Sequence, residues 1–88
     1  MNTVRFKILH HIGVLKTEQN GWTRELNIVS WNDGDPKFDI RSWDETHERM
    51  SRGITLTQLE TDKLSYLLSH NAMRIGEGGV SKVGEDVQ

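Results

Sequence analysis

The chain has 88 residues, a formal net charge of −2 and no cysteine, with 34% hydrophobic and 27% charged residues. This length allows one domain, and the lack of cysteine excludes a disulfide framework and a thiolate metal site. No apolar run approaches the length of a signal peptide or a membrane span, so we expect a soluble domain in the cytoplasm.

The first half of the chain carries patterns typical of β-strands. Val4 to Lys16 is rich in apolar residues, and Gly13 within it indicates a bulge or a bend. The segment from Thr17 to Gly21 ends in Asn-Gly and predicts a turn, which is followed by a second strand from Trp22 to Trp31.

A third strand is expected after the turn Asn32 to Pro36, in the segment Lys37 to Trp43. Its alternation places Phe38 and Ile40 on one face, which we assign to a core. The opposite face holds charged residues and ends in a large aromatic ring. After a polar loop, Asp44 to Arg52, a short fourth strand is predicted from Gly53 to Leu56.

One helix follows the strands. Thr57 and Glu60 have the spacing of a capping box, and the helix is expected to run to about His70. Leu64, Leu67 and Leu68 share one stripe, which must pack on the sheet, on a second chain or on both. The predicted fold is α+β, with the order β-β-β-β-α, and a core this small favours a dimer.

The chain divides into two parts by composition. Residues 1–71 form the predicted domain. Residues 72–88 contain four glycines among charged residues and have no periodicity, so we expect a disordered Gly-rich tail.

The sheet face that the helix leaves uncovered indicates a function. It carries Lys37, Arg41 and Trp43, and exposed aromatics beside cations suit single-stranded nucleic acid, whose bases stack on rings while phosphates meet Lys and Arg. The acidic net charge counts against this interpretation. However, residues 1–56 hold eight Lys or Arg and eight Asp or Glu, so the acid excess lies in the last third.

Several motifs in this chain resemble the transcriptional positive cofactor four (PC4-like) family, and in particular its bacterial YdbC-like branch. They are the run FDIRSW at 38–43, the run RGITL at 52–56, the segment GWTRELNIVSWN at 21–32 and the loop HERM at 47–50. The resemblance implies a four-stranded curved antiparallel sheet followed by a helix. It also implies a homodimer formed through the helices, with grooves for single-stranded DNA.

The resemblance and the face pattern together select the candidate nucleic-acid-binding residues. Trp31 and Trp43 are expected to stack on bases, and Lys37, Arg41 and Arg52 to meet phosphates. Lys7 is a further candidate cation. The expected partners are single-stranded DNA, with RNA also open, and a second copy of the chain. We expect no membrane, small-molecule substrate, cofactor or metal.

Other functional classes find little support. His10 and His11 are adjacent in a strand and point to opposite faces, so we expect surface histidines, as at His47 and His70. No catalytic motif is present, and no catalytic residue is assigned.

Aspartates give no sign of a metal site either. Asp33 and Asp35 fit a turn, and Asp39 is expected to pair with a cation across the sheet. The alternative function is a protein-interaction module that uses the open sheet face.

Overall fold

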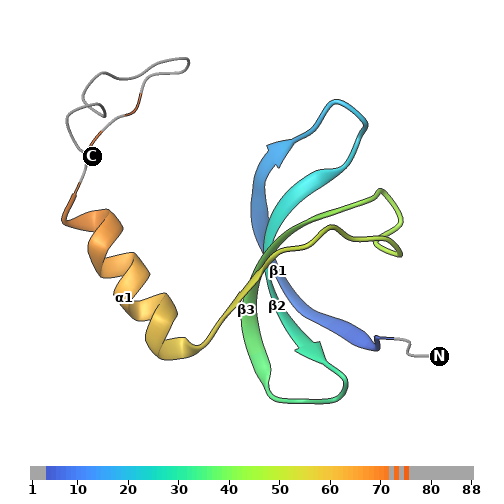
Figure 1. Ribbon diagram of the computed structural model, residues 1–88, viewed down its shortest axis with the longest axis horizontal. Helices are drawn as coiled ribbons and strands as arrows, with labels where there is room; N and C mark the ends of the chain where they lie inside the picture. Colours follow the sequence, from blue (N-terminus) through green and yellow to red (C-terminus); the bar gives the residue numbers. More distant parts are fainter. Residues whose placement is uncertain (1–3, 72, 74, 76–88) are drawn as a thin grey trace.

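The protein is an open antiparallel sheet followed by one helix. The computed structural model describes residues 4–71, 73 and 75. In chain order, the elements are β1 (Phe6–Thr17), β2 (Thr23–Trp31), β3 (Pro36–Trp43), β4 (Ile54–Leu56) and α1 (Gln58–Ser69) (Figure 1). The strands lie in the order β1-β2-β3-β4, which confirms the predicted fold class and element order.

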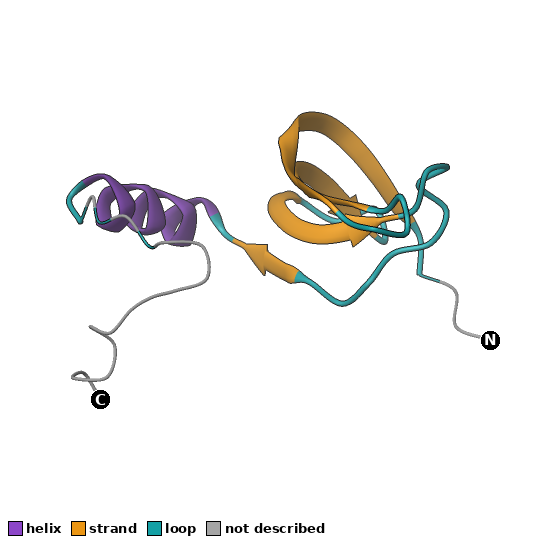
Figure 2. Ribbon diagram, turned by 90° about the horizontal axis from the view of Figure 1, so that it is seen from above, coloured by secondary structure: helices purple, strands orange, loops and turns teal. Residues whose placement is uncertain are grey.

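Bulges bend β1. Its pairing with β2 shifts register between Ile8 and His10, between His11 and Gly13, and between Val14 and Lys16. A bulge adds an unpaired residue, which bends the strand and increases its twist. The bend predicted at Gly13 is confirmed, and three such shifts along one strand curl the sheet on itself (Figure 2).

The curl gives the sheet two unlike faces. We call the inner face the one whose buried residues are Glu25, Asn27, Val29, Asp39 and Trp43. The outer face carries Leu26, Ile28, Phe38 and Ile40, which are all only half-buried. The pairing of β2 with β3 confirms that Phe38 and Ile40 lie opposite Lys37, Arg41 and Trp43.

The expectation for Trp43 was wrong. Trp43 was expected to lie exposed on the uncovered face, but its relative exposure is 0%. Curvature brings Phe6 of β1 to a ring-centroid distance of 5.0 Å from Trp43, and His47 stacks on the same ring at 5.6 Å. The inside of the curl therefore closes over Trp43 without a covering helix.

The helix begins and ends close to where the sequence predicted. The Thr57 hydroxyl accepts from the Glu60 amide at 3.1 Å, and the Glu60 carboxylate accepts from the Thr57 amide at 2.9 Å, so the capping box is confirmed. No residue of α1 is buried. The helix lies to one side of the sheet, beyond β4 (Figure 2), and Leu68 is 65% exposed.

The predicted tail, residues 72–88, lies outside the described residues apart from positions 73 and 75, which are exposed. Within the described part of the chain, no helix has the length and apolar character needed to cross a membrane.

Candidate nucleic-acid interface

Two of the predicted residues form a stacked pair at the inner face. The Arg41 guanidinium carbon lies 4.5 Å from the centre of the Trp31 ring, and the Phe6 ring lies 6.0 Å from the same ring. A guanidinium over an indole face is attracted by the ring's quadrupole. The structure therefore brings together a predicted aromatic and a predicted cation that are ten residues apart in sequence.

Arg41 is held rigidly rather than free. Its Nε and Nη2 donate to the two carboxylate oxygens of Asp39 at 2.7 and 2.8 Å, and Thr55 donates to the same carboxylate at 3.0 Å. Asp39 is fully buried, and the Arg41 side chain is 13% exposed. We expected Asp39 to pair with a cation across the sheet, and this was wrong. Its partner is Arg41, which lies two residues further along the same strand.

The turn between β2 and β3 positions Lys37. Asn32 and Asp33 have φ values of 51° and 63°, and the Gly34 amide donates to the Trp31 carbonyl at 2.8 Å. Two successive residues with a left-handed backbone make a tight hairpin turn, and Asn and Asp tolerate that conformation. Lys37 pairs with Val29 and therefore shares the face of Trp31, with its side chain exposed at the rim.

Arg52 is held in place by the loop that joins β3 to β4. Ser42 and Ser51 exchange two hydrogen bonds, from the Ser51 amide at 2.9 Å and from the Ser42 amide at 3.0 Å. Asp44 accepts from the amides of Glu48 and Arg49 at 2.9 and 3.1 Å. The loop therefore has a defined path, and it leaves Arg52 exposed beside β3.

The remaining predicted residues lie elsewhere. Trp43 is sealed inside the curl and offers no exposed ring for a base. Lys7 pairs with Ser30, so it projects from the outer face rather than from the face of Trp31. Of the six predicted residues, four lie on the inner face, and three of these are at least partly exposed: Trp31, Lys37 and Arg41. Arg52 is exposed at the adjoining edge of the sheet.

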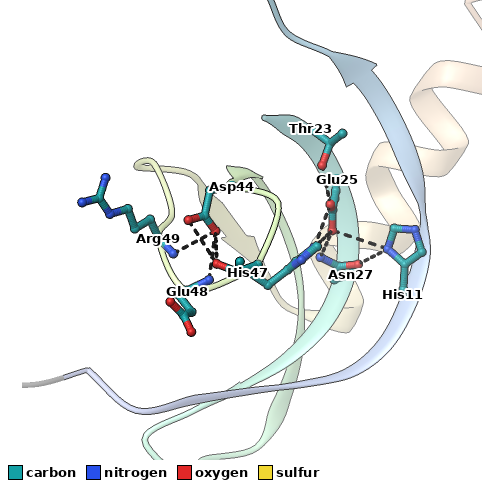
Figure 3. Close-up of polar contacts among 9 residues, drawn as sticks. His11, Thr23, Glu25, Asn27, Asp44, His47, Glu48 and Arg49 are labelled. Atoms are coloured by element: carbon teal, nitrogen blue, oxygen red, sulfur yellow. Dashed lines mark hydrogen bonds and ion pairs between the residues drawn. The ribbon is translucent and has the colours of Figure 1, made fainter. Parts of the chain in front are cut away.

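A buried polar cluster on the inner face was missed by the sequence analysis. His47 Nε2 lies 2.9 Å from the Glu25 carboxylate, and Asn27 donates to that carboxylate at 3.1 Å (Figure 3). His11 Nδ1 donates to the Asn27 side-chain oxygen at 2.7 Å. His11 and His47 do lie at the surface, as expected, with side chains 51% and 39% exposed. The sequence analysis missed that they link β1 and the β3–β4 loop to β2.

Opposing effects act on the Glu25 carboxyl. Burial by itself raises its pKa, but hydrogen bonds from Thr23, Asn27 and His47, together with the charge of His47, outweigh this and hold the pKa below its ordinary value of 4.5. A signal was present in the sequence, because Thr23, Glu25 and Asn27 alternate along one strand. That alternation is typical of a solvated face, and the curl buries it instead.

No metal site is found among the residues that the structure describes. Between residues 4 and 71, no three His, Asp or Glu side chains are grouped as metal ligands. His11 and His47 both direct a ring nitrogen at the Glu25–Asn27 pair, so those nitrogens are already engaged.

Comparison with known proteins decides the family. The family model described as Transcriptional Coactivator p15 (PC4) matches residues 18–66, more than half of the chain. The chain belongs to the PC4 family. An uncharacterized protein of Treponema pallidum (strain Nichols) is 39% identical over 64 residues, which cover 73% of this chain and 75% of that protein.

The PC4 match coincides with the interface. Residues 18–66 include Trp31, Lys37, Arg41, Trp43 and Arg52, whereas Lys7 precedes them. PC4 proteins are non-enzymatic and bind single-stranded DNA as transcription cofactors, and membership supports that class of function here.

Proposed function

We propose that this protein is a homodimeric single-stranded DNA-binding protein of low sequence specificity. It would act in transcription regulation, replication or repair, in the cytoplasm and beside the nucleoid of a bacterium. The observation that carries the proposal is the stacked pair of Trp31 and Arg41, with Lys37 on the same face, inside the segment that matches the PC4 family.

The chemistry of the inner face suits single-stranded DNA that is bound without sequence specificity. A base can stack against the exposed part of Trp31, while Lys37 and Arg52 meet the phosphates on either side. The buried acceptors of the inner face are already engaged within the protein. Glu25 and Asn27 hydrogen-bond to each other and to histidines, and Asp39 holds Arg41. Low specificity follows from that engagement.

Trp43 acts in this proposal as a support rather than as a platform. It packs against Phe6, and Phe6 in turn lies against Trp31. The buried ring would hold the curvature that sets Trp31 beneath Arg41.

The homodimer is proposed from apolar surface that one chain leaves open. A groove of about 590 Å³ separates α1 from the outer face. Its apolar lining residues are Leu15, Leu26, Phe38, Ile40, Leu56, Leu64 and Leu68. On α1, Leu67 is 48% exposed and Leu68 is 65% exposed. A contiguous apolar surface of this kind marks an interface, and the helix of a second copy has the matching leucine stripe.

Tryptophan fluorescence tests the proposal directly. Oligo-dT should change the emission of the three tryptophans, and the affinity should fall steeply as salt rises because phosphate contacts release counterions. Duplex DNA of the same length should bind more weakly. Lys37→Gln should reduce the salt dependence of the oligo-dT affinity. Lys63→Gln removes an equal charge from α1, away from the inner face and outside the lining of the apolar groove, and should leave that salt dependence unchanged.

Absence of any oligo-dT binding at low salt would overturn the proposed function. Such a result would favour the protein-interaction module. Oligo-dT binding that does not weaken as salt rises would contradict the proposed phosphate contacts. Sedimentation should give twice the chain mass of 10.1 kDa, and a monomer at micromolar concentration would refute the dimer.

A further inference from the structure

A small groove at the edge of the sheet gathers arginines. It has a volume of about 290 Å³. Its lining residues are Arg24, Ile40, Arg41, Arg52, Gly53 and Ile54. Three of the chain's 11 Lys and Arg thus meet in one place, and among the described residues no carboxylate lines the groove. In a protein of net charge −2, this makes a local positive site.

The register of the strands explains how the groove forms. Arg24 pairs with Ser42 at the outer face, and Ile40 pairs with Ile54 to make an apolar floor on that same face. Arg41 comes from the inner face and reaches the groove at its border.

Gly53 permits this close approach. A Cβ at that position would overlap the Ile40 carbonyl oxygen and the Arg41 Cβ. The missing side chain lets the loop pass directly over Arg41, and it sets Arg52 beside the groove.

The three guanidiniums are not equally available. Arg41 is committed to Asp39, which balances its charge. The Arg24 side chain is 53% exposed and forms an ion pair with Glu18 at 3.8 Å, a distance too long for a hydrogen bond. Within the described residues, Arg52 has no carboxylate within ion-pair distance. Arg24 and Arg52 therefore keep donors free for an added anion.

We propose that this groove holds one backbone phosphate of the bound single strand, with Arg24 and Arg52 donating to its oxygens and the sugar packed on Ile54, which is 52% exposed and lies outside the groove assigned to the dimer. A guanidinium presents a planar fork of donors that matches phosphate oxygens. The inference rests on the proposed function and extends it, because Arg24 lies outside the inner face and had no assigned role.

The position of Arg41 connects this groove to the stacking site. Its guanidinium lies over Trp31, and its side chain also lines the groove. A strand with a base at Trp31 can therefore continue around the sheet edge to the arginines. The apolar floor suits a sugar and gives no hydrogen-bond readout, which is consistent with low specificity.

The test compares two matched variants of the full chain. Arg24→Gln should weaken oligo-dT binding roughly two- to five-fold, the range of an exposed ion pair. It should also reduce the slope of log affinity against log salt by about 0.7, the value for one phosphate of a single strand. Lys16→Gln removes the same charge directly across the strand pair from Arg24, outside the groove, and should leave the slope unchanged.

The outcomes separate this inference from the proposed function. If wild-type protein binds oligo-dT but Arg24→Gln keeps the full slope, the groove assignment is wrong and the function stands. Equal losses for Arg24→Gln and Lys16→Gln would also overturn it, since charge alone would then explain both. Wild-type protein that fails to bind oligo-dT would remove the function itself.

A second arm identifies the source of the phosphate. Inorganic phosphate in millimolar excess is expected to leave oligo-dT binding at constant ionic strength unchanged, because a lone phosphate lacks the stacking at Trp31. Saturable binding of inorganic phosphate that Arg24→Gln abolishes would mean a free-anion site and would overturn the strand assignment.

Discussion

Removal of the Trp43 ring should unfold much of the protein rather than only weaken its binding. Trp43 is fully buried, with Phe6 at 5.0 Å and His47 stacked at 5.6 Å between ring centroids. Truncation of a buried tryptophan to alanine costs about 3–5 kcal/mol of unfolding free energy. Small domains have only about 5–15 kcal/mol in total, so Trp43→Ala would leave a marginal fold.

Urea denaturation followed by far-ultraviolet circular dichroism measures this loss, since the backbone signal does not depend on the deleted ring. The midpoint should fall by at least about 1 M. Trp22→Ala is the control, because Trp22 is only half-buried beside a turn and should cost less than half as much. If Trp43→Ala unfolds at the wild-type urea concentration and loses only DNA binding, the ring is an exposed stacking platform and the core assignment is refuted.

Three further predictions concern the cluster, the dimer and the groove. The pKa of Glu25 is depressed below 4.5, so its stabilising contribution is present above that pH and is lost as the pH falls through the lower, folded-state value. Acid titration of stability should show this loss in the wild type and a flatter profile in Glu25→Gln; equal acid sensitivity would contradict the argument. Leu68→Asp should halve the sedimentation mass while circular dichroism stays unchanged, and a dimer that persists would refute the role of the helix stripe. Gly53→Ala should force the loop away from Arg41 and weaken oligo-dT binding, whereas Gly13→Ala, where a Cβ meets nothing within 4 Å, should leave that affinity unaltered.

Local chemistry in the sequence determined the elements and their order. The capping box at Thr57 and Glu60 specified where the helix begins, because both residues satisfy amides that the helix leaves unpaired. Turn residues Asn32 and Asp33 marked the β2–β3 turn. Alternation along β3 correctly assigned Phe38 to one face and Arg41 to the other, since side-chain direction in a strand has a period of two.

Only the tertiary structure decided which face is closed and what each site residue does. Alternation along a strand indicates which side chains share a face. The alternating pattern is identical for an exposed face and a buried one, so it does not show which face is buried. Three bulges in β1 curl the sheet until Phe6 covers Trp43, and this contact joins residues 37 positions apart in the sequence. The same curvature buries Glu25 under His47 and sets Arg41 over Trp31. Such contacts depend on the summed bend of several strands, which no local pattern encodes.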